Sequence, residues 1–227
     1  MSRMFKSIDD TWNVFKGCRF GCSYCNAEKA AKTRLRHIPR YKDGFTPKLI
    51  ESELYRNFRP GKFIFVAYMG DIAWATLNQF EMILSRIRQF PQTDFLICTK
   101  NPHCFWPSEF NFPPNVILGA TIETNRRHLI NAHSRAPSPV TRFRYLAGYP
   151  HSRKFLSIEP IMDFDLEEMT HWIELLQPNI IEIGADNYHN SLPEPPWSKV
   201  EALLQNARQL CPRVIEKDGL GRLKGGR

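Results

Sequence analysis

The sequence predicts an α/β protein whose parallel strands form a partial, open (β/α)6-type TIM-like barrel. Two observations lead to this fold class. Apolar runs rich in β-branched and aromatic residues alternate with amphipathic helical segments along nearly the whole chain, an order typical of a parallel sheet. The apolar runs are continuous, which indicates strands that are buried on both faces. Six or seven strand–helix units joined by right-handed crossovers would curl into an open barrel.

The strands are expected where these apolar runs occur. A short opening strand is predicted near residues 11–15, and a closing strand near residues 213–216. The buried strands between them are predicted at residues 63–68, 95–99, 116–122, 155–158 and 180–183.

The helices are expected where apolar residues recur at helical spacing. Thr46 and Pro47 would begin a first helix through an N-cap and a first-turn proline, Thr76 would cap a second, and Asn125 would cap a short one. The predicted apolar stripes are Ile50, Leu54 and Phe58; Phe80, Ile83, Leu84 and Ile87; Leu129 and Ile130; Leu166, Met169, Ile173 and Leu176; and Val200, Leu203, Leu204 and Ala207.

Length and composition favour one domain in a reducing compartment. The 227 residues suffice for one sizeable core, so we expect a single domain over residues 1–218 and a flexible, basic, glycine-rich tail over 219–227. The chain shows neither a run of about 18 uncharged apolar residues nor an apolar signal-peptide core. We therefore expect a cytoplasmic protein without membrane contact, where thiols stay reduced.

Three cysteines in a short run are the candidate metal ligands of the chain. Cys18, Cys22 and Cys25 follow a CxxxCxxC spacing, and three such thiolates can hold three corners of a 4Fe-4S cluster while leaving one iron open. An electron-transfer cluster normally takes four cysteine ligands, whereas the other cysteines are dispersed at Cys98, Cys104 and Cys211. The spacing therefore favours a cluster with an open iron.

The cysteine run is also compatible with a zinc site. A structural zinc accepts three cysteines and one histidine, and His37 lies downstream, although zinc sites usually use paired CxxC motifs. A disulfide framework fits poorly, because three close thiols leave one unpaired. A zinc-stabilised nucleic-acid-binding module and an electron-carrying cluster protein are thus the alternatives to an enzyme.

Polar residues follow the predicted strands at the edge where a parallel barrel carries its active site. Gly70 and Asp71 follow the second strand, Lys100 the third, Glu123 and Asn125 the fourth, and Glu159 the fifth. The cysteine run follows the first strand, so all of them should meet at one rim. Simpler roles also fit: Asp71 as a helix cap, Glu123 and Glu159 as ion-pair partners, and Lys100 as a solvated residue.

The CxxxCxxC run with an aromatic residue before its third cysteine resembles the signature of the radical S-adenosylmethionine (radical SAM) superfamily. Residues 12–18 (WNVFKGC) and 155–160 (FLSIEP) resemble an uncharacterised phage and prokaryotic branch that is distantly similar to spore photoproduct lyase. The resemblance implies an enzyme that uses a 4Fe-4S cluster to cleave S-adenosylmethionine (SAM) reductively and to abstract a hydrogen from a substrate. It also implies a flavodoxin-like or ferredoxin-like reductant.

The same resemblance suggests roles for single residues. The open iron would bind the methionine part of SAM, and the turn at Gly70 and Asp71 would contact its amino group. The backbone near Tyr24 would face the adenine, and the region of Glu123, Asn125 and Glu159 would bind the ribose. Cys98 and Lys100 are candidate catalytic residues, although Cys98 is most simply a small buried side chain.

Two basic segments suggest the class of substrate. The chain carries 31 Lys and Arg against 23 Asp and Glu, and the excess gathers in the acid-free segments 29–42 and 126–154. Aromatic residues interleave the second segment, as in surfaces that bind nucleic acids. We therefore expect a nucleic-acid or nucleotide substrate, with a solvated basic face as the alternative.

Overall fold

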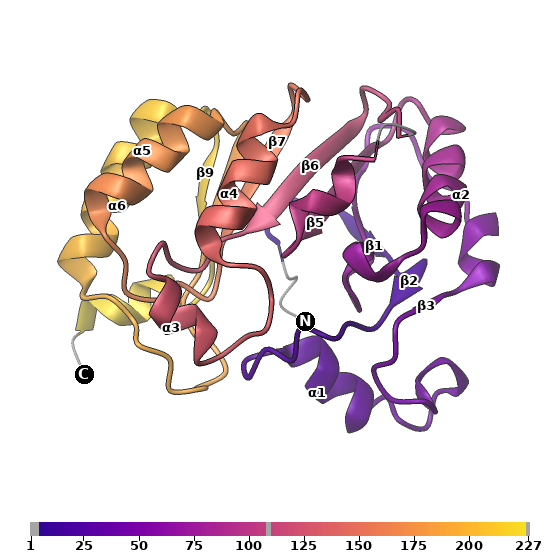
Figure 1. Cartoon of the computed structure of the whole chain (residues 1–227), viewed down its shortest axis with the longest axis horizontal. Helices are drawn as coiled ribbons and strands as arrows, with labels where there is room; N and C mark the ends of the chain where they lie inside the picture. The colour runs from indigo at the N-terminus through magenta and orange to yellow at the C-terminus, as the bar shows by residue number, and fades with distance from the viewer. Residues whose placement is uncertain (1–4, 108–109, 226–227) are drawn as a thin grey trace.

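The computed structural model describes residues 5–107 and 110–225, which fold around a curled sheet of seven parallel strands. The strands lie side by side in chain order, each parallel to the next. Within the described residues, the first and last strands form the two edges, so the sheet is an open half-barrel (Figure 1). The strands are β1 (Asp10–Trp12), β4 (Phe63–Val66), β5 (Asp94–Thr99), β6 (Val116–Thr121), β7 (Lys154–Ile158), β8 (Ile180–Ile183) and β9 (Val214–Glu216).

Helices cover the outer face of the sheet and bury its first hydrophobic layer (Figure 1). Leucine and isoleucine side chains of the helices pack there against strand residues such as Leu118 and Leu156. The N-cap predicted at Thr76 is confirmed, and it forms a capping box in which Thr76 and Gln79 exchange hydrogen bonds. The outer helices are α2 (Leu77–Arg88), α4 (Pro139–Gly148), α5 (Leu166–Leu176) and α6 (Trp197–Leu210).

The N-terminal segment fills the inner face of the half-barrel. The Phe5 ring lies 4.9 Å from that of Phe65 and 4.8 Å from that of Phe155. The backbone N–H groups of Lys6 and Ser7 each donate to one oxygen of the buried Glu182 carboxylate at 2.8 Å. The strands are therefore buried on both faces, as their continuous apolar runs predicted.

The carboxyl ends of the strands face the side of the molecule that carries α1 (Asn26–Lys32) and α3 (Arg127–Asn131) (Figure 1). A two-stranded antiparallel ribbon, β2 (Phe15–Lys16) and β3 (Lys48–Leu49), lies beside the first strand. Short 3₁₀ turns occupy Pro39–Tyr41, Glu51–Tyr55, Ile72–Trp74, Pro102–Phe105 and Leu220–Gly225. Among the described residues, no helix has the length and apolar character needed to cross a membrane.

The helix predicted after Thr46 is wrong. Leu49 pairs with Phe15 in the antiparallel ribbon, and the N–H of Ile50 donates to the carbonyl of Val14 at 2.7 Å. The following turn, Glu51–Tyr55, buries none of its residues. The apolar spacing was misleading because this segment satisfies its backbone by pairing with the chain that leads into the cysteine run.

Two smaller predictions also differ from the structure. Asn125 does not cap α3. Its side chain exchanges two hydrogen bonds of 2.8 Å with the backbone of Asp165, at the start of α5. The predicted flexible tail is packed over residues 219–225: Leu220 is fully buried, and Arg222 pairs with Glu194. A buried apolar side chain and an ion pair thus anchor a segment whose composition predicts mobility, and residues 226–227 lie outside the described part.

Candidate functional site

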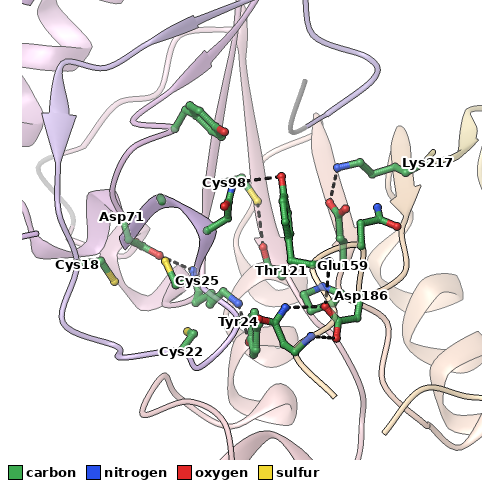
Figure 2. A pocket seen from close by; sticks show the side chains of 18 of the residues that line it. Cys18, Cys22, Tyr24, Cys25, Asp71, Cys98, Thr121, Glu159, Asp186 and Lys217 are labelled. Atoms are coloured by element: carbon green, nitrogen blue, oxygen red, sulfur yellow. Dashed lines mark hydrogen bonds and ion pairs between the residues drawn. The ribbon is translucent and has the colours of Figure 1, made fainter. Parts of the chain in front are cut away.

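A cavity of about 500 Å³ opens at the carboxyl ends of the strands (Figure 2). The three cysteines lie on one side of it, and Glu159, Lys217 and Asp186 lie on the opposite side. Most of the site residues predicted from the sequence line this cavity: Cys18, Cys22, Tyr24, Cys25, Gly70, Asp71, Cys98, Lys100 and Glu159. Glu123 and Asn125 are not among its lining residues.

The start of the cysteine loop is fixed by a close backbone contact with the turn after β4. Gly17 donates to the carbonyl of Met69 at 2.8 Å, and Asp71 donates to the carbonyl of Gly17 at 3.1 Å. A Cβ atom at Gly70 would come within 2.7 Å of Gly17 N, so the approach requires glycine. Gly17 itself has φ of +82°. The contact places Asp71 beside the first cysteine.

Backbone donors point at two of the sulfurs. Cys18 Sγ accepts the N–H of Phe20, and Cys25 Sγ accepts the N–H of Glu28, both at 3.4 Å. Cys25 is also the N-cap of α1. Burial, followed by the charge of Asp71, raises the pKa of Cys18, and burial raises the pKa of Cys25. Both are therefore neutral thiols that release a proton when they ligate a metal.

A segment after α3 clamps the cysteine loop. Ser23 N donates to the carbonyl of His133 at 2.8 Å, and Arg135 N donates to the carbonyl of Phe20 at 2.8 Å. Between these two anchors, Ser134 Oγ lies 3.0 Å from Cys22 Sγ. The sequence offers no local signal for these contacts, because the two segments are more than 100 residues apart.

A buried charge network holds Tyr24, the aromatic residue of the cysteine run. Tyr24 donates its hydroxyl proton to Glu123 Oε1 at 2.6 Å, and Lys100 Nζ donates to the Tyr24 oxygen at 2.8 Å. Glu123 also pairs with Lys100 and, at 2.7 Å, with Arg142. Glu123 and Arg142 are both fully buried.

The charges of this network set the ionisation of Glu123. Burial alone would raise the pKa of Glu123, but Arg142 and Lys100 outweigh burial and lower it to about 2. Glu123 is thus an ionised anchor for three neighbours below the cavity wall. These contacts make its side chain an ion-pair partner, the simpler of the two roles that its sequence position allows.

The other two acidic candidates also have protein partners. Asp71 caps the 3₁₀ turn Ile72–Trp74 through Ala73 N at 3.0 Å and accepts the Thr99 hydroxyl at 2.5 Å. Glu159 pairs with Lys217. Burial raises the pKa of both carboxyl groups. Both nevertheless line the cavity, so each can contact a ligand there while it keeps its structural partner.

Cys98 faces the cavity from β5, between the cysteine loop and the Glu159 side (Figure 2). Its Sγ lies 3.8 Å from Thr121 Oγ1, and burial raises its pKa to about 12. Cys98 is therefore a neutral thiol on the cavity wall. Cys211 is buried at the end of α6 and is not among the residues that line the cavity.

The residues present fit a cluster with an open iron together with a cofactor of nucleoside size. Three thiols from one loop lie at the edge of a cavity whose volume suits a small-molecule ligand. In the described part of the chain, no three His, Cys, Asp or Glu side chains are spaced to hold a single metal ion.

Each basic segment contains both ion-paired and exposed cations. In segment 126–154, Arg126, Arg142 and Arg153 each form an ion pair with an acidic side chain, and Lys154 donates to a backbone carbonyl. In segment 29–42, Arg34 and Arg36 are exposed. The charge of Arg34 acts on Tyr68, which lines the cavity. The second segment also carries exposed cations, Arg127, Arg135 and Arg144, and Arg135 donates to the carbonyl of Arg19 in the cysteine loop.

Comparison with known structures identifies the fold. Spore photoproduct lyase, solved with bound AdoMet and dinucleoside spore photoproduct, superposes with a TM-score of 0.59 at 13% identity, covering 92% of this chain and 64% of that chain. SuiB from Streptococcus suis bound to S-adenosylmethionine gives 0.56 at 9% identity, covering 95% and 52%. A radical SAM methyltransferase from Sphaerobacter thermophilus gives 0.51 at 14% identity, covering 96% and 69%. This chain thus spans about 64% of the length of spore photoproduct lyase.

Sequence comparison identifies the family. No curated protein matches the chain. The family described as "Protein of unknown function (DUF5131)" matches residues 4–177, well over half of the chain. The chain belongs to the DUF5131 family, and its half-barrel is the fold of radical SAM enzymes.

Proposed function

We propose that this protein is a radical SAM enzyme. The observation that carries the proposal is the position of the CxxxCxxC loop: Cys18, Cys22 and Cys25 all line one cavity at the carboxyl ends of a parallel half-barrel. Two of the structures that share this fold contain SAM. The three cysteines would ligate a 4Fe-4S cluster, and SAM would occupy the cavity beside them.

The chain's own residues would bind and orient these groups. Bound together, a reduced cluster and SAM supply a carbon radical that can abstract hydrogen from an unactivated position. The contact between Gly17 and Asp71 holds the acidic turn next to the first cysteine. The network of Glu123, Lys100 and Arg142 fixes Tyr24 and, through it, the last cysteine. The apolar side chains of the cavity would exclude water.

Anaerobic reconstitution of the full chain tests the proposal. We expect about four irons per chain, and SAM cleavage to 5'-deoxyadenosine when dithionite is added. Cys22→Ala should abolish cleavage, whereas Cys211→Ala, at the end of α6 and outside the cavity lining, should retain it. Stoichiometric zinc in anaerobically purified protein, with no SAM cleavage, would contradict an enzyme and support a zinc-stabilised module. A cluster that transfers electrons but leaves SAM intact would support an electron carrier.

We further propose a nucleic acid or nucleotide as the substrate. Two observations support this class: the exposed Arg34 of segment 29–42, whose charge acts on the cavity-lining Tyr68, and the dinucleoside ligand of spore photoproduct lyase, which shares the fold. A basic surface beside a cavity suits phosphate contacts along a strand whose base enters the cavity. A flavodoxin-like or ferredoxin-like protein would supply the electron.

Salt-dependent binding tests the substrate class. Arg34→Glu with Arg36→Glu should weaken retention of single-stranded DNA or RNA and reduce the salt slope by about 2, roughly one for each lost phosphate contact. Arg59→Glu with Lys62→Glu is the matched control, because it reverses the same number of charges at two exposed cations that precede β4 at the opposite end of the sheet. Equal binding by the two double variants would contradict a nucleic-acid substrate.

A further inference from the structure

Cys22 differs from the other two cysteines of the loop in what contacts its sulfur. Backbone N–H groups reach Cys18 and Cys25, whereas the sulfur of Cys22 meets a side-chain hydroxyl, Ser134 Oγ, at 3.0 Å. Ser134 is only 7% exposed and lies 112 residues further along the chain. A side-chain contact can be removed by mutation without changing the backbone of the loop.

The hydrogen bond has a defined direction once Cys22 is a metal ligand. Ser134 Oγ already accepts the N–H of Ala136 at 3.1 Å. A ligating cysteine is a thiolate and has no proton to give. The proton between the two atoms must then be that of the Ser134 hydroxyl, so the serine donates to the sulfur.

The backbone holds Ser134 in register with Cys22. The hydrogen bonds from Ser23 to His133 and from Arg135 to Phe20 flank the serine on both sides. Ser134 N also donates to the carbonyl of Ile130 at 2.9 Å, at the end of α3. The hydroxyl is therefore presented to the sulfur by a fixed segment.

We propose that Ser134 is a positioning residue that supports Cys22 as a cluster ligand and raises the reduction potential of the cluster. This inference rests on the proposed function, because it requires a cluster on the three cysteines. A hydrogen bond to a ligand sulfur stabilises negative charge on the cluster, and the reduced state carries one more negative charge than the oxidised state. The reduced state is therefore stabilised more, which makes reduction easier.

Redox titration of the reconstituted full chain, followed by electron paramagnetic resonance, tests the inference. Ser134→Ala should shift the midpoint potential to more negative values, and Ser134→Thr, which keeps the hydroxyl, should restore it. Ser23→Ala is the matched control: it removes a 3.0 Å side-chain contact with His133 on the same loop but touches no sulfur. Its potential should equal that of the wild type.

The outcomes separate this inference from the proposed function. An unchanged potential and iron content in Ser134→Ala would overturn the inference and leave the enzyme proposal intact. A folded Ser134→Ala that loses the cluster, together with a wild-type-like Ser134→Thr, would support it. Equal loss in both variants would overturn a role for the hydroxyl. A wild-type chain that binds no cluster at all would overturn the proposed function and the inference together.

Discussion

Glu123 holds three neighbours near the site through buried contacts. Its two oxygens are shared by Tyr24, Lys100 and Arg142, and both it and Arg142 are fully buried. Removing one partner of a buried ion pair leaves the other charge buried without compensation. The resulting loss in unfolding free energy exceeds the net stabilisation that the intact pair provides.

Glu123→Ala should therefore lower the free energy of unfolding by about 3–5 kcal/mol, measured by urea denaturation. Glu81→Ala is the control, because the Glu81–Arg88 pair is exposed at the surface, and such pairs contribute about 1 kcal/mol or less. If the two variants lost the same stability, the network would not be the anchor that its geometry indicates.

Stability should also depend on pH through Glu123. Its pKa is about 2 in the folded protein, against an ordinary value of 4.5 for a glutamate. A group whose pKa is lowered by folding stabilises the protein above its unfolded pKa, and that stabilisation disappears as the pH falls toward the folded value. The difference in unfolding free energy between the wild type and Glu123→Gln should shrink between pH 5 and pH 2, about the interval set by the two pKa values. A constant difference over this range would contradict the lowered pKa.

At the residue scale, the sequence predicted many of the residues that line the cavity, but it did not predict the hydrogen bonds that hold them in place. Asp71, Lys100 and Glu159 could be found because they directly follow strands that the apolar runs reveal. Ser134 and its link to Cys22 could not, because no local pattern connects side chains 112 residues apart. The cofactor roles assigned to Glu123 and Asn125 stay predictions.

At the scale of elements, the turn after β4 and the cysteine loop behave as one unit. Their backbones meet at Gly17 and Gly70, where a Cβ atom would come within 2.7 Å of the neighbouring main chain. Two backbone hydrogen bonds and this close approach tie the start of the loop to the turn, so we expect the position of the loop to depend on the path of the turn.

Gly70→Ala should push the two segments apart. We expect a loss of about 1–3 kcal/mol in unfolding free energy from overpacking, and a lower iron content after reconstitution. Gly221→Ala, which has open space around the added methyl group, should change stability by no more than about 0.5 kcal/mol. Normal iron loading of Gly70→Ala would show that the loop position does not depend on this contact.

The elements that the sequence predicted well are those whose own residues decide their structure. The longer strands and α2 follow from continuous or periodic apolar residues and from a complete capping box. The segment after Thr46 was wrong because its hydrogen-bond partner, the chain at Val14 and Phe15, comes from elsewhere in the fold. The helical spacing of apolar residues does not determine the structure of a segment that pairs with a distant part of the chain.

At the scale of the whole molecule, the segment at Lys6 and Ser7 contacts β8 and the chain just after β9. Lys6 and Ser7 bind Glu182 on β8, and Lys6 pairs with Asp218 just after β9 at 2.6 Å. Lys6 and Lys217 also line the cavity. The N-terminal segment thus forms part of the wall of the cavity in which we place the reaction.

Glu182→Ala should release this segment. The amide protons of Lys6 and Ser7 should exchange with solvent at least about tenfold faster, since a hydrogen bond to a charged group contributes about 1.5–3 kcal/mol. Alkylation of Cys98, followed by peptide mass spectrometry, should accelerate with it. Glu182→Gln, which keeps one acceptor oxygen, should give rates between those of the wild type and Glu182→Ala. Unchanged exchange in Glu182→Ala would show that the Phe5 packing alone holds the segment.

The pairing of Lys6 and Ser7 with Glu182 also has a consequence for biosynthesis. The two partners are separated by 176 and 175 residues, so a ribosome must translate the chain as far as residue 182 before Lys6 and Ser7 find their acceptor. Until then the segment lacks its hydrogen-bond anchor over the inner sheet face, and a nascent chain that stalls early holds this aromatic face less firmly covered against chaperones and aggregation. We therefore expect late completion of the barrel interior during synthesis, in spite of the early appearance of its first strands.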